Sequence, residues 1–547
     1  MANIPTWKTK AASKREEVLN LIPSEWRLPL PLPPPSDLPC ARGETIRQYL
    51  SPTEIKITET DAMGIVEHTS SGKWRCEDVA KAFCHRAALA HQMINCLHEI
   101  FFQAAIENAR KLDRYFDQWK KPYGPLHGLP VSLKDSINVQ DVNTSMGYIG
   151  WLNNPPNVSE SEIVKELRAL GAILYVKTSV PQGSFSGETT NHIIGRTDNP
   201  HNRHLVVGGS SGGEGGLLAL GGSPVGFGTD IGGSIRVPAG WNGCYGLRPS
   251  TGRLPYEGIA STLPGQCSIP FVVGPLARSV RDLAFMMKAV LGMEPWKFDP
   301  LVHEVPWREI QYEMAMARFC GSRERLAFGV LFSDGVVNPQ PPVLRALREV
   351  VDLVMSLGHI VMEWKPPSHA RAVKIWRDIS LIDGGKAFHE ALALSGEPAT
   401  PTIFGAKASS PVDASTVMER NVSLNNYRKA YLDYWDSTAS ITGSGRPVDA
   451  LITPFHQGPP PAPGKVRYMA SVLPVTQVKK KVDKYPSGYS PLNETDSLVY
   501  SDYDVDLLDG APVGVQLVGR RLQEETVLAL TAGISHQLGD TRRSKRL

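Results

Sequence analysis

The spacing of apolar residues in the first quarter of the chain predicts helices. Within residues 60–120, Val79, Phe83, Ala87 and Ala90 recur every three to four positions, which places them on one face of a helix. A helix with one apolar face packs that face on a core and turns its polar face to solvent. We therefore expect an N-terminal helical layer over the rest of the fold.

Further along, strand-like runs alternate with helical ones. Leu129, Val131 and Leu133 alternate with polar or small residues and predict a strand that ends at Lys134. A helix over 160–170 and a strand over 172–177 follow. The alternation returns later, with strand-like runs at 326–331, 450–453 and 513–518 and helical runs at 341–357 and 523–536. This alternation predicts an α/β fold.

The chain is expected to consist of an arm and one large domain. Residues 1–58 open with a helical stretch and continue through a proline-rich run at 28–39. Because proline fixes φ and lacks an N–H group, this run should be extended and should lie over the body of the protein. Residues 59–547 contain no internal repeat and no linker, so we expect them to form a single domain.

The composition narrows the class of protein. The chain has 58 Lys and Arg against 55 Asp and Glu, with no basic stripe among aromatic residues, so nucleic acid is not expected as a partner. No apolar run reaches the roughly 18 residues that span a bilayer, and the N-terminus lacks the apolar core of a secretory signal. Seven scattered cysteines without a CxxC pair suit a cytoplasmic protein, and Lys545-Arg546-Leu547 is only loosely similar to a peroxisomal address.

Glycine and serine are concentrated in residues 208–236. Twelve of these 29 residues are glycine, and four are serine: Ser210, Ser211, Ser223 and Ser234. Glycine loses much backbone entropy on ordering, so such a density needs a physical reason. A flexible linker is disfavoured because apolar residues such as Leu217 and Phe227 are present. We interpret the stretch as a site where the backbone approaches a ligand.

Three short motifs overlap this stretch. Residues 208–213 have the spacing of a phosphate-binding loop, but Glu214 stands where the lysine should be and would repel phosphate. Residues 226–228 begin like a dinucleotide-binding motif whose last glycine is missing. Residues 208–212 match the GxSxG nucleophile elbow, which leaves Ser210 as an alternative nucleophile with a histidine base. No HExxH motif or other tight metal-ligand cluster occurs among the 14 histidines.

Lys134 is a candidate base. A serine nucleophile needs a neighbouring group to remove its proton, and a lysine can do so when burial keeps it neutral near pH 7. Lys134 stands at the end of an apolar strand, where such burial is expected. A surface lysine paired with Asp135 would give the same sequence, so the pattern alone leaves both interpretations open.

Ser234 is a candidate nucleophile. It follows Gly232 and Gly233, and adjacent glycines allow several backbone N–H groups to converge on one point. Such donors stabilise the negative charge that develops on a carbonyl oxygen during acyl transfer. Asp230 and Arg236 flank this serine, and we expect them to form an ion pair that braces the loop rather than to take part in the chemistry.

Two blocks of sequence together resemble the amidase signature family. The block GGSSGGEGG…GSPVGFGTDIGGSIRVPAGWNGCYGLRPSTGRLP is similar to the family signature, and GLPVSLKDSINV, upstream, is similar to its lysine-bearing strand. Weaker similarity covers most of the chain from about Leu50, and residues 76–102 and 179–191 resemble the fungal acetamidase-like, general amidase branch. The resemblance implies one catalytic domain at 59–547, with a central mixed β-sheet flanked by helices on both faces.

The resemblance also implies a Ser–cis-Ser–Lys triad that hydrolyses a small-molecule amide through an acyl-enzyme. Ser234 would be the acylated nucleophile and Lys134 the neutral base. Ser210, on a cis peptide bond, would relay the proton between them. No metal or cofactor is required by this chemistry.

The remaining site residues are likewise implied by the resemblance. Ser184 would line the substrate site, and Ser211 would support the cis turn. The oxyanion hole would be formed by the backbone N–H groups of Ile231, Gly232, Gly233 and Ser234.

The chain departs from the family pattern after Pro463. Residues 464–476 are several residues shorter than the corresponding family segment, in a region that lies near the substrate pocket in relatives. A shorter wall would widen the pocket or uncover apolar surface, unless Ala470–Val475 form an ordinary paired strand. Three aromatic residues are candidates for the pocket lining, although packing in the core is the simpler interpretation: Tyr148, Trp151 and Trp241.

Three alternatives to a stand-alone amidase stay open. The chain could be the glutaminase-like subunit of a tRNA-dependent amidotransferase, although its long N-terminal extension argues against this. It could be a binding protein that has lost the chemistry, or an elbow hydrolase that uses Ser210. The acyl group of the substrate is not defined by the sequence, and a homodimer is expected only because relatives dimerise.

Overall fold

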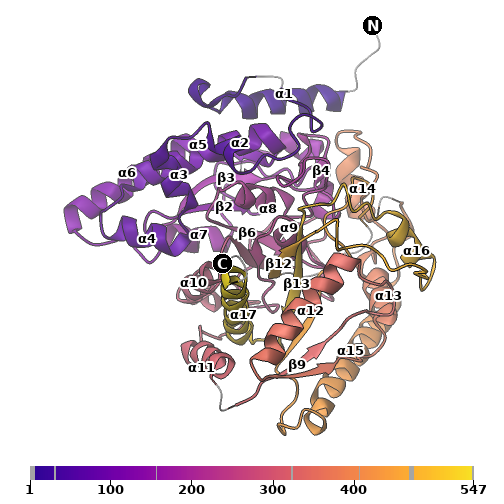
Figure 1. Ribbon diagram of the computed structural model, residues 1–547. Coiled ribbons are helices and arrows are strands. Elements are labelled where there is room, and N and C mark those ends of the chain that lie inside the picture. Colours follow the sequence, from indigo (N-terminus) through magenta and orange to yellow (C-terminus); the bar gives the residue numbers. More distant parts are fainter. Residues whose placement is uncertain are drawn as a thin grey trace.

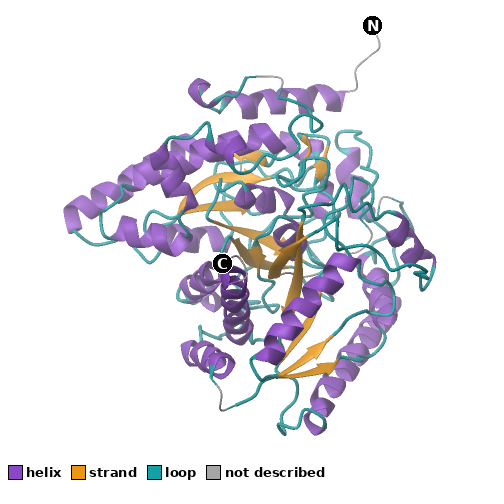
Figure 2. Cartoon of the chain, viewed as in Figure 1, coloured by secondary structure: helices purple, strands orange, loops and turns teal. Residues whose placement is uncertain are grey.

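The computed structural model describes residues 6–29, 32–155, 157–321, 324–405, 407–466 and 473–544. Helices and strands alternate along these residues (Figure 1), so the predicted α/β class is confirmed. Figure 2 shows the strands in the interior with helices around them.

The strands form two mixed sheets and one short pair. In spatial order, the six-stranded sheet contains β1 (Leu97–Ile100), β3 (Ile173–Thr178), β2 (Pro130–Lys134), β6 (Val225–Asp230), β8 (Val272–Ala277) and β7 (Tyr245–Gly246). The five-stranded sheet contains β10 (Ile360–Glu363), β9 (Ala327–Val330), β11 (Ala450–Pro454), β13 (Pro512–Val518) and β12 (Leu473–Gln477). The short pair is β4 (Thr190–Asn191) with β5 (Gly195–Arg196). The edge strands β7 and β12 are in contact, so the two sheets meet there.

Helices precede, separate and follow these strands. Those in the first half are α1 (Thr6–Asn20), α2 (Glu44–Arg47), α3 (Pro52–Glu59), α4 (Ala62–Ser70), α5 (Cys76–Ile94), α6 (Phe102–Trp119), α7 (Glu162–Ala169), α8 (Gly212–Ala219) and α9 (Arg236–Trp241). Those in the second half are α10 (Val280–Leu291), α11 (Glu309–Cys320), α12 (Pro341–Ser356), α13 (His369–Ser380), α14 (Lys386–Ala393), α15 (Ala414–Ser437), α16 (Glu494–Ser501) and α17 (Glu524–Ser544).

Most predicted elements are present. The strand predicted to end at Lys134 is β2, and the helix and strand predicted after it are α7 and β3. The later runs correspond to β9, α12, β11, β13 and α17. β2 and β3 are buried along their whole length, which suits the interior of a sheet with parallel neighbours.

One element was predicted wrongly. The continuous helical pattern at 60–120 contains a strand, β1, that pairs antiparallel with β3. Asn95 ends α5 in a left-handed conformation at φ 56°, and its N–H donates to the carbonyl of His91. The apolar run that follows fits either a helix or a buried strand, and pairing with a distant strand decides between them.

The N-terminal helix α1 is joined to the six-stranded sheet by a buried ion pair. Lys14 Nζ lies 2.9 Å from Glu99 Oε2 on β1, and both residues are less than a tenth exposed. Figure 1 shows α1 as a separate layer beside α5 and α2, as the predicted helical layer requires. Of the proline-rich run, Pro33 and Leu38 offer carbonyls to Arg203, so these parts lie on the body; residues 30 and 31 are outside the described residues. The domain boundary at 58/59 stays a prediction.

We predict that Lys14→Met destabilises the protein by about 3–5 kcal/mol, because it leaves the buried Glu99 carboxylate without its partner. Urea unfolding of the full chain measures the change. Lys8→Met is the matched control, since Lys8 lies on the same helix and is exposed. Equal, small effects of the two substitutions would contradict a stabilising role for the ion pair.

Candidate active site

The carboxyl end of β2 places the Lys134 amine inside the six-stranded sheet. β2 lies between β3 and β6, parallel to both, and Lys134 is its last residue. Lys134 Nζ donates to Ser210 Oγ at 2.7 Å and to Thr229 Oγ1 at 2.8 Å, with the Thr229 carbonyl at 3.4 Å. The amine therefore has defined acceptors on the glycine-rich stretch and on β6.

Burial controls the protonation of Lys134. The residue is 0% exposed, so the charged ammonium form loses its hydration, and this lowers the pKa of Lys134 to about 7. The nearby carboxylates of Asp230, Glu214 and Asp135 act in the opposite direction and raise it. A substantial neutral fraction is thus available near pH 7. This decides against the surface-lysine interpretation.

Ser210 and Ser211 stand at the turn that begins α8. The peptide bond between Gly209 and Ser210 is cis. Ser211 N donates to the carbonyl of Ser234 at 3.0 Å, so this turn and the Ser234 loop are held together. All three serines are buried. No hydrogen bond joins the side chains of Ser210 and Ser234 in the described structure. The Ser210 hydroxyl is hydrogen-bonded to the Lys134 amine. Among the described residues, no histidine is hydrogen-bonded to Ser210.

Two glycines of β6 allow α8 to approach the sheet. A Cβ atom at Gly226 would lie 2.0 Å from Glu214 Oε2, and one at Gly228 would lie 2.6 Å from Ser211 Oγ. Glu214 is fully buried and accepts hydrogen bonds from Ser132 and Thr178. The glycines of β6 therefore permit α8 to pack closely against this strand.

Asp230 organises the loop that carries Ser234. Its two carboxylate oxygens accept from Gly233 N at 2.8 Å and Ile235 N at 3.0 Å. The expected ion pair is present, since Arg236 Nε and Nη2 each lie 2.9 Å from Asp230, and Arg248 Nε lies at 3.4 Å. Burial alone would raise the pKa of Asp230, but these partners hold it below its ordinary value.

The arrangement of the loop changes one detail of the predicted oxyanion hole. The Gly233 N–H group is engaged by Asp230, so it is not free to bind a substrate oxygen in this geometry. Within the described residues, the N–H groups of Ile231, Gly232 and Ser234 donate to no protein acceptor. Three of the four predicted donors are therefore available.

The structure separates the other predicted pocket residues. Ser184 has φ 60°, and its hydroxyl faces Met146 Sδ at 4.0 Å, with no hydrogen bond to Lys134, Ser210 or Ser234 among the described residues. Tyr148 is buried and bonds to Thr262, and Trp241 is buried with its N–H on the Gly458 carbonyl. For both, packing is the observed role.

Trp151 and the shortened segment are placed only in part. Trp151 packs on the small cluster around Tyr148. In the shortened segment, Leu473–Gln477 forms β12, paired with β13. Residues 467–472 lie outside the described residues, so the expectation about Ala470–Val475 is met only for its last three positions.

Two residues of this site were missed by sequence reasoning. Thr229 supplies the second acceptor for Lys134, and its place in the signature block is the only signal that could have suggested it. Trp376 on α13 lies over the loop, because a Cβ at Gly232 would be 3.5 Å from its Cζ2 and 3.8 Å from its Nε1. The buried Trp376 N–H has no partner among the described residues. Nothing in the local sequence brings α13 to this loop.

Comparison with known proteins assigns the class. A sequence model described as Amidase matches residues 78–528. The chain is 42% identical to an acetamidase of Aspergillus oryzae and 40% identical to one of Emericella nidulans, in each case over 98% of this chain and 99% of the relative. A solved structure of a fatty acid amide hydrolase superposes with TM-score 0.89 at 33% identity and covers 98% of this chain and 95% of its own.

The chain therefore belongs to the amidase family, and it is an amidase. Within that family it is similar to the fungal acetamidases, as the resemblance of residues 76–102 and 179–191 predicted. Across the part of the chain that the structure describes, no helix is long and apolar enough to cross a membrane. All seven cysteines are free thiols.

We predict that kcat/KM for amide hydrolysis falls as pH decreases through about 7. The pKa of Lys134 is lowered to about 7, so the amine is protonated below this pH and cannot accept a proton. A pH–rate profile from pH 5 to 10 measures the acidic limb. An acidic limb near pH 10, where an exposed lysine titrates, would contradict a lowered pKa of Lys134 as its cause.

Proposed function

We propose that this amidase hydrolyses a carboxamide to a carboxylate and ammonia or an amine through a Ser–cis-Ser–Lys triad. Ser234 is the nucleophile, Ser210 the proton relay and Lys134 the base. The observation that carries the proposal is the 2.7 Å hydrogen bond between the buried Lys134 amine and Ser210 Oγ. A fully buried lysine on a serine hydroxyl has no structural advantage over an apolar pair, which favours a chemical role.

In the proposed mechanism, Ser234 is acylated first and water then hydrolyses the acyl-enzyme. The neutral Lys134 amine accepts the proton of Ser210 while Ser210 accepts that of Ser234, and Ser234 Oγ bonds to the amide carbon. The N–H groups of Ile231, Gly232 and Ser234 stabilise the oxyanion. The relay then returns a proton to the amide nitrogen as the C–N bond breaks. Water attacks the acyl-enzyme by the same route and releases the carboxylate.

A small aliphatic amide is the substrate class that we propose. Two relatives that align over nearly their whole length are named acetamidases. Trp376 supports a confined site, because its ring lies within van der Waals distance of the space above Gly232. Its unpartnered N–H group is placed to donate to the bound amide, since a buried donor without an acceptor costs free energy that a ligand can recover.

Assembly and location complete the proposal. We propose a cytoplasmic enzyme, which the seven free thiols support. Lys545–Leu547, which are loosely similar to a peroxisomal address, lie outside the described residues. A homodimer stays a prediction. Sedimentation of the protein as a monomer in analytical ultracentrifugation would contradict it.

We predict that Ser234→Ala, Ser210→Ala and Lys134→Ala each lower kcat by at least about 10⁴-fold on acetamide, because triad members act as a unit. A fluorophosphonate label, mapped by peptide mass spectrometry, should modify Ser234 in the wild-type protein and nothing in Lys134→Ala.

Ser223→Ala is the control for this series, since Ser223 lies in the same stretch but bonds to Ser132. Activity that survives Ser234→Ala, with the label on Ser210, would support the elbow hydrolase instead. If the isolated, folded wild-type protein neither reacts with the label nor hydrolyses any amide, a binding protein or an obligate complex would be favoured.

We predict that Trp376→Phe lowers kcat/KM for acetamide about three- to tenfold, since the substitution keeps an aromatic ring but removes the indole N–H donor. Steady-state kinetics measure the change, and Trp119→Phe, at an exposed position, is the control. Unchanged kinetics in a folded Trp376→Phe enzyme would exclude this contact with the substrate.

A further inference from the structure

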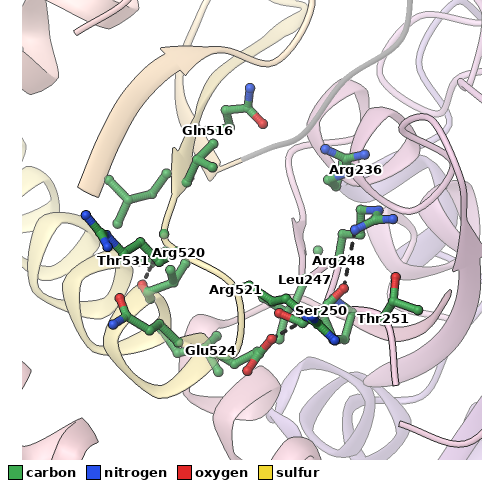
Figure 3. Close-up of a pocket in the computed structure, with 18 of the residues that line it drawn as sticks. Arg236, Leu247, Arg248, Ser250, Thr251, Gln516, Arg520, Arg521, Glu524 and Thr531 are labelled. Carbon is green, nitrogen blue, oxygen red and sulfur yellow. Dashed lines mark hydrogen bonds between the residues drawn. The ribbon is translucent and has the colours of Figure 1, made fainter. Parts of the chain in front are cut away.

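A cavity separate from the triad lies where the two sheets meet. Its volume is about 620 Å³, within the range of small-molecule sites. It is lined by residues of β7, β12, β13, α10 and α17 and by the loops at 247–251 and 267–270. Figure 3 shows Arg236 and Arg248 on one wall, opposite Gln516, Arg520 and Thr531 on the other. Among the described lining residues, none is Lys134, Ser210 or Ser234.

Arginine is concentrated in this cavity. The acidic residue that lines it is Glu524. The arginines that line it are five: Arg236, Arg248, Arg428, Arg520 and Arg521. The whole chain has a formal net charge of only +3, so the excess is local. Glu524 does not offset it, because its carboxylate is engaged by Arg253 and by Ser250 N.

The protein's own carboxylates satisfy only part of this charge. Arg236 and Arg248 share Asp230, and Arg520 is paired with Asp436. Arg428 and Arg521 have no carboxylate within 4.0 Å in the described part of the chain; they contact the Ser268 carbonyl and the His303 ring instead. Burial, followed by the charge of Arg521, lowers the pKa of Arg428. Both guanidinium groups line the cavity and repel each other, so an anion bound near them would reduce the repulsion.

The remaining wall is apolar. Leu283 of α10, Val527 and Leu528 of α17, and Leu517 of β13 line the same space. A ligand that fills it would therefore combine an anionic group for the guanidinium forks with an apolar portion for these side chains. Simple inorganic ions would leave most of the volume unused.

We propose that this cavity binds a small organic anion, a carboxylate or phosphate attached to an apolar group, and that its occupancy regulates the Ser234 loop. The route is short. Arg236 and Arg248 hold Asp230, and Asp230 holds Gly233 N and Ile235 N on either side of Ser234. An anion that competes with Asp230 for the two arginines loosens this support and slows acylation. This second part rests on the proposed function; the binding itself does not.

Isothermal titration of the full-length protein with phenyl phosphate, phenylacetate and neutral benzyl alcohol tests the binding. We expect saturable binding of at least one anion, weaker at high salt, and none of the alcohol. The comparison of the two anions identifies the preferred charged group. Absence of saturable binding by both anions, or equal binding of benzyl alcohol, would overturn the proposal.

Variants locate the site. Arg428→Gln and Arg521→Gln, both at exposed positions, should each weaken binding about tenfold, the loss of one charge-assisted contact. Lys429→Gln removes an exposed charge from the neighbouring position of α15 and should leave the affinity unchanged. If all three variants bind the anion as tightly as the wild-type protein does, the anion binds elsewhere and the proposal for this cavity is refuted. If one arginine variant is unfolded by circular dichroism, the other, folded variant still locates the site.

The coupling is tested by the rate of fluorophosphonate labelling at Ser234 with and without saturating phenyl phosphate. We expect at least a twofold slower reaction in the wild-type protein, with the effect reduced at the same concentration in Arg521→Gln. Unchanged labelling of the saturated protein would overturn the coupling. A protein that binds the anion but never labels at Ser234 would refute the proposed triad and leave the binding site established.

Discussion

The burial of one lysine amine is the constraint on which the site depends. Lys134 ends a strand that is covered on both sides, so its ammonium form is costly and its neutral form is accessible near pH 7. An uncharged amine in such a place still needs hydrogen-bond partners. Ser210 and Thr229 supply them, and they lie on two segments that only the folded sheet brings to Lys134. The cost of burial is thus offset by two hydrogen bonds of the Lys134 amine.

Close approach of backbone segments makes those contacts possible. Side chains at Gly226 or Gly228 would collide with Glu214 or Ser211, so α8 could not pack against β6 if these positions were substituted. Asp230, at the end of the same strand, fixes the loop after it by accepting two backbone N–H groups. One strand therefore sets both the packing of α8, which begins just after Ser210, and the shape of the loop that carries Ser234.

Support for the site extends beyond the region that defines the family. The amidase match begins at residue 78, yet Lys14 of α1 pairs with Glu99, and Glu99 lies in register with Lys177 on β3. Lys177 Nζ is 3.5 Å from Asp135, the residue after Lys134. Buried charges of alternating sign thus connect the N-terminal helix to the strand that ends at Lys134. At the other side of the site, the arginine-lined cavity contacts Asp230 through Arg236 and Arg248.

The sequence by itself determined the α/β alternation, the strand that ends at Lys134 and the residues of the signature block. These depend on local periodicity and on short motifs, which a single chain displays directly. Only the tertiary structure decided that β1 is a strand, that Gly233 N–H is taken by Asp230, and that Thr229, Trp376 and the five arginines converge. Each of these outcomes depends on contacts between residues far apart in the chain, and no local pattern records which distant segment will be the partner.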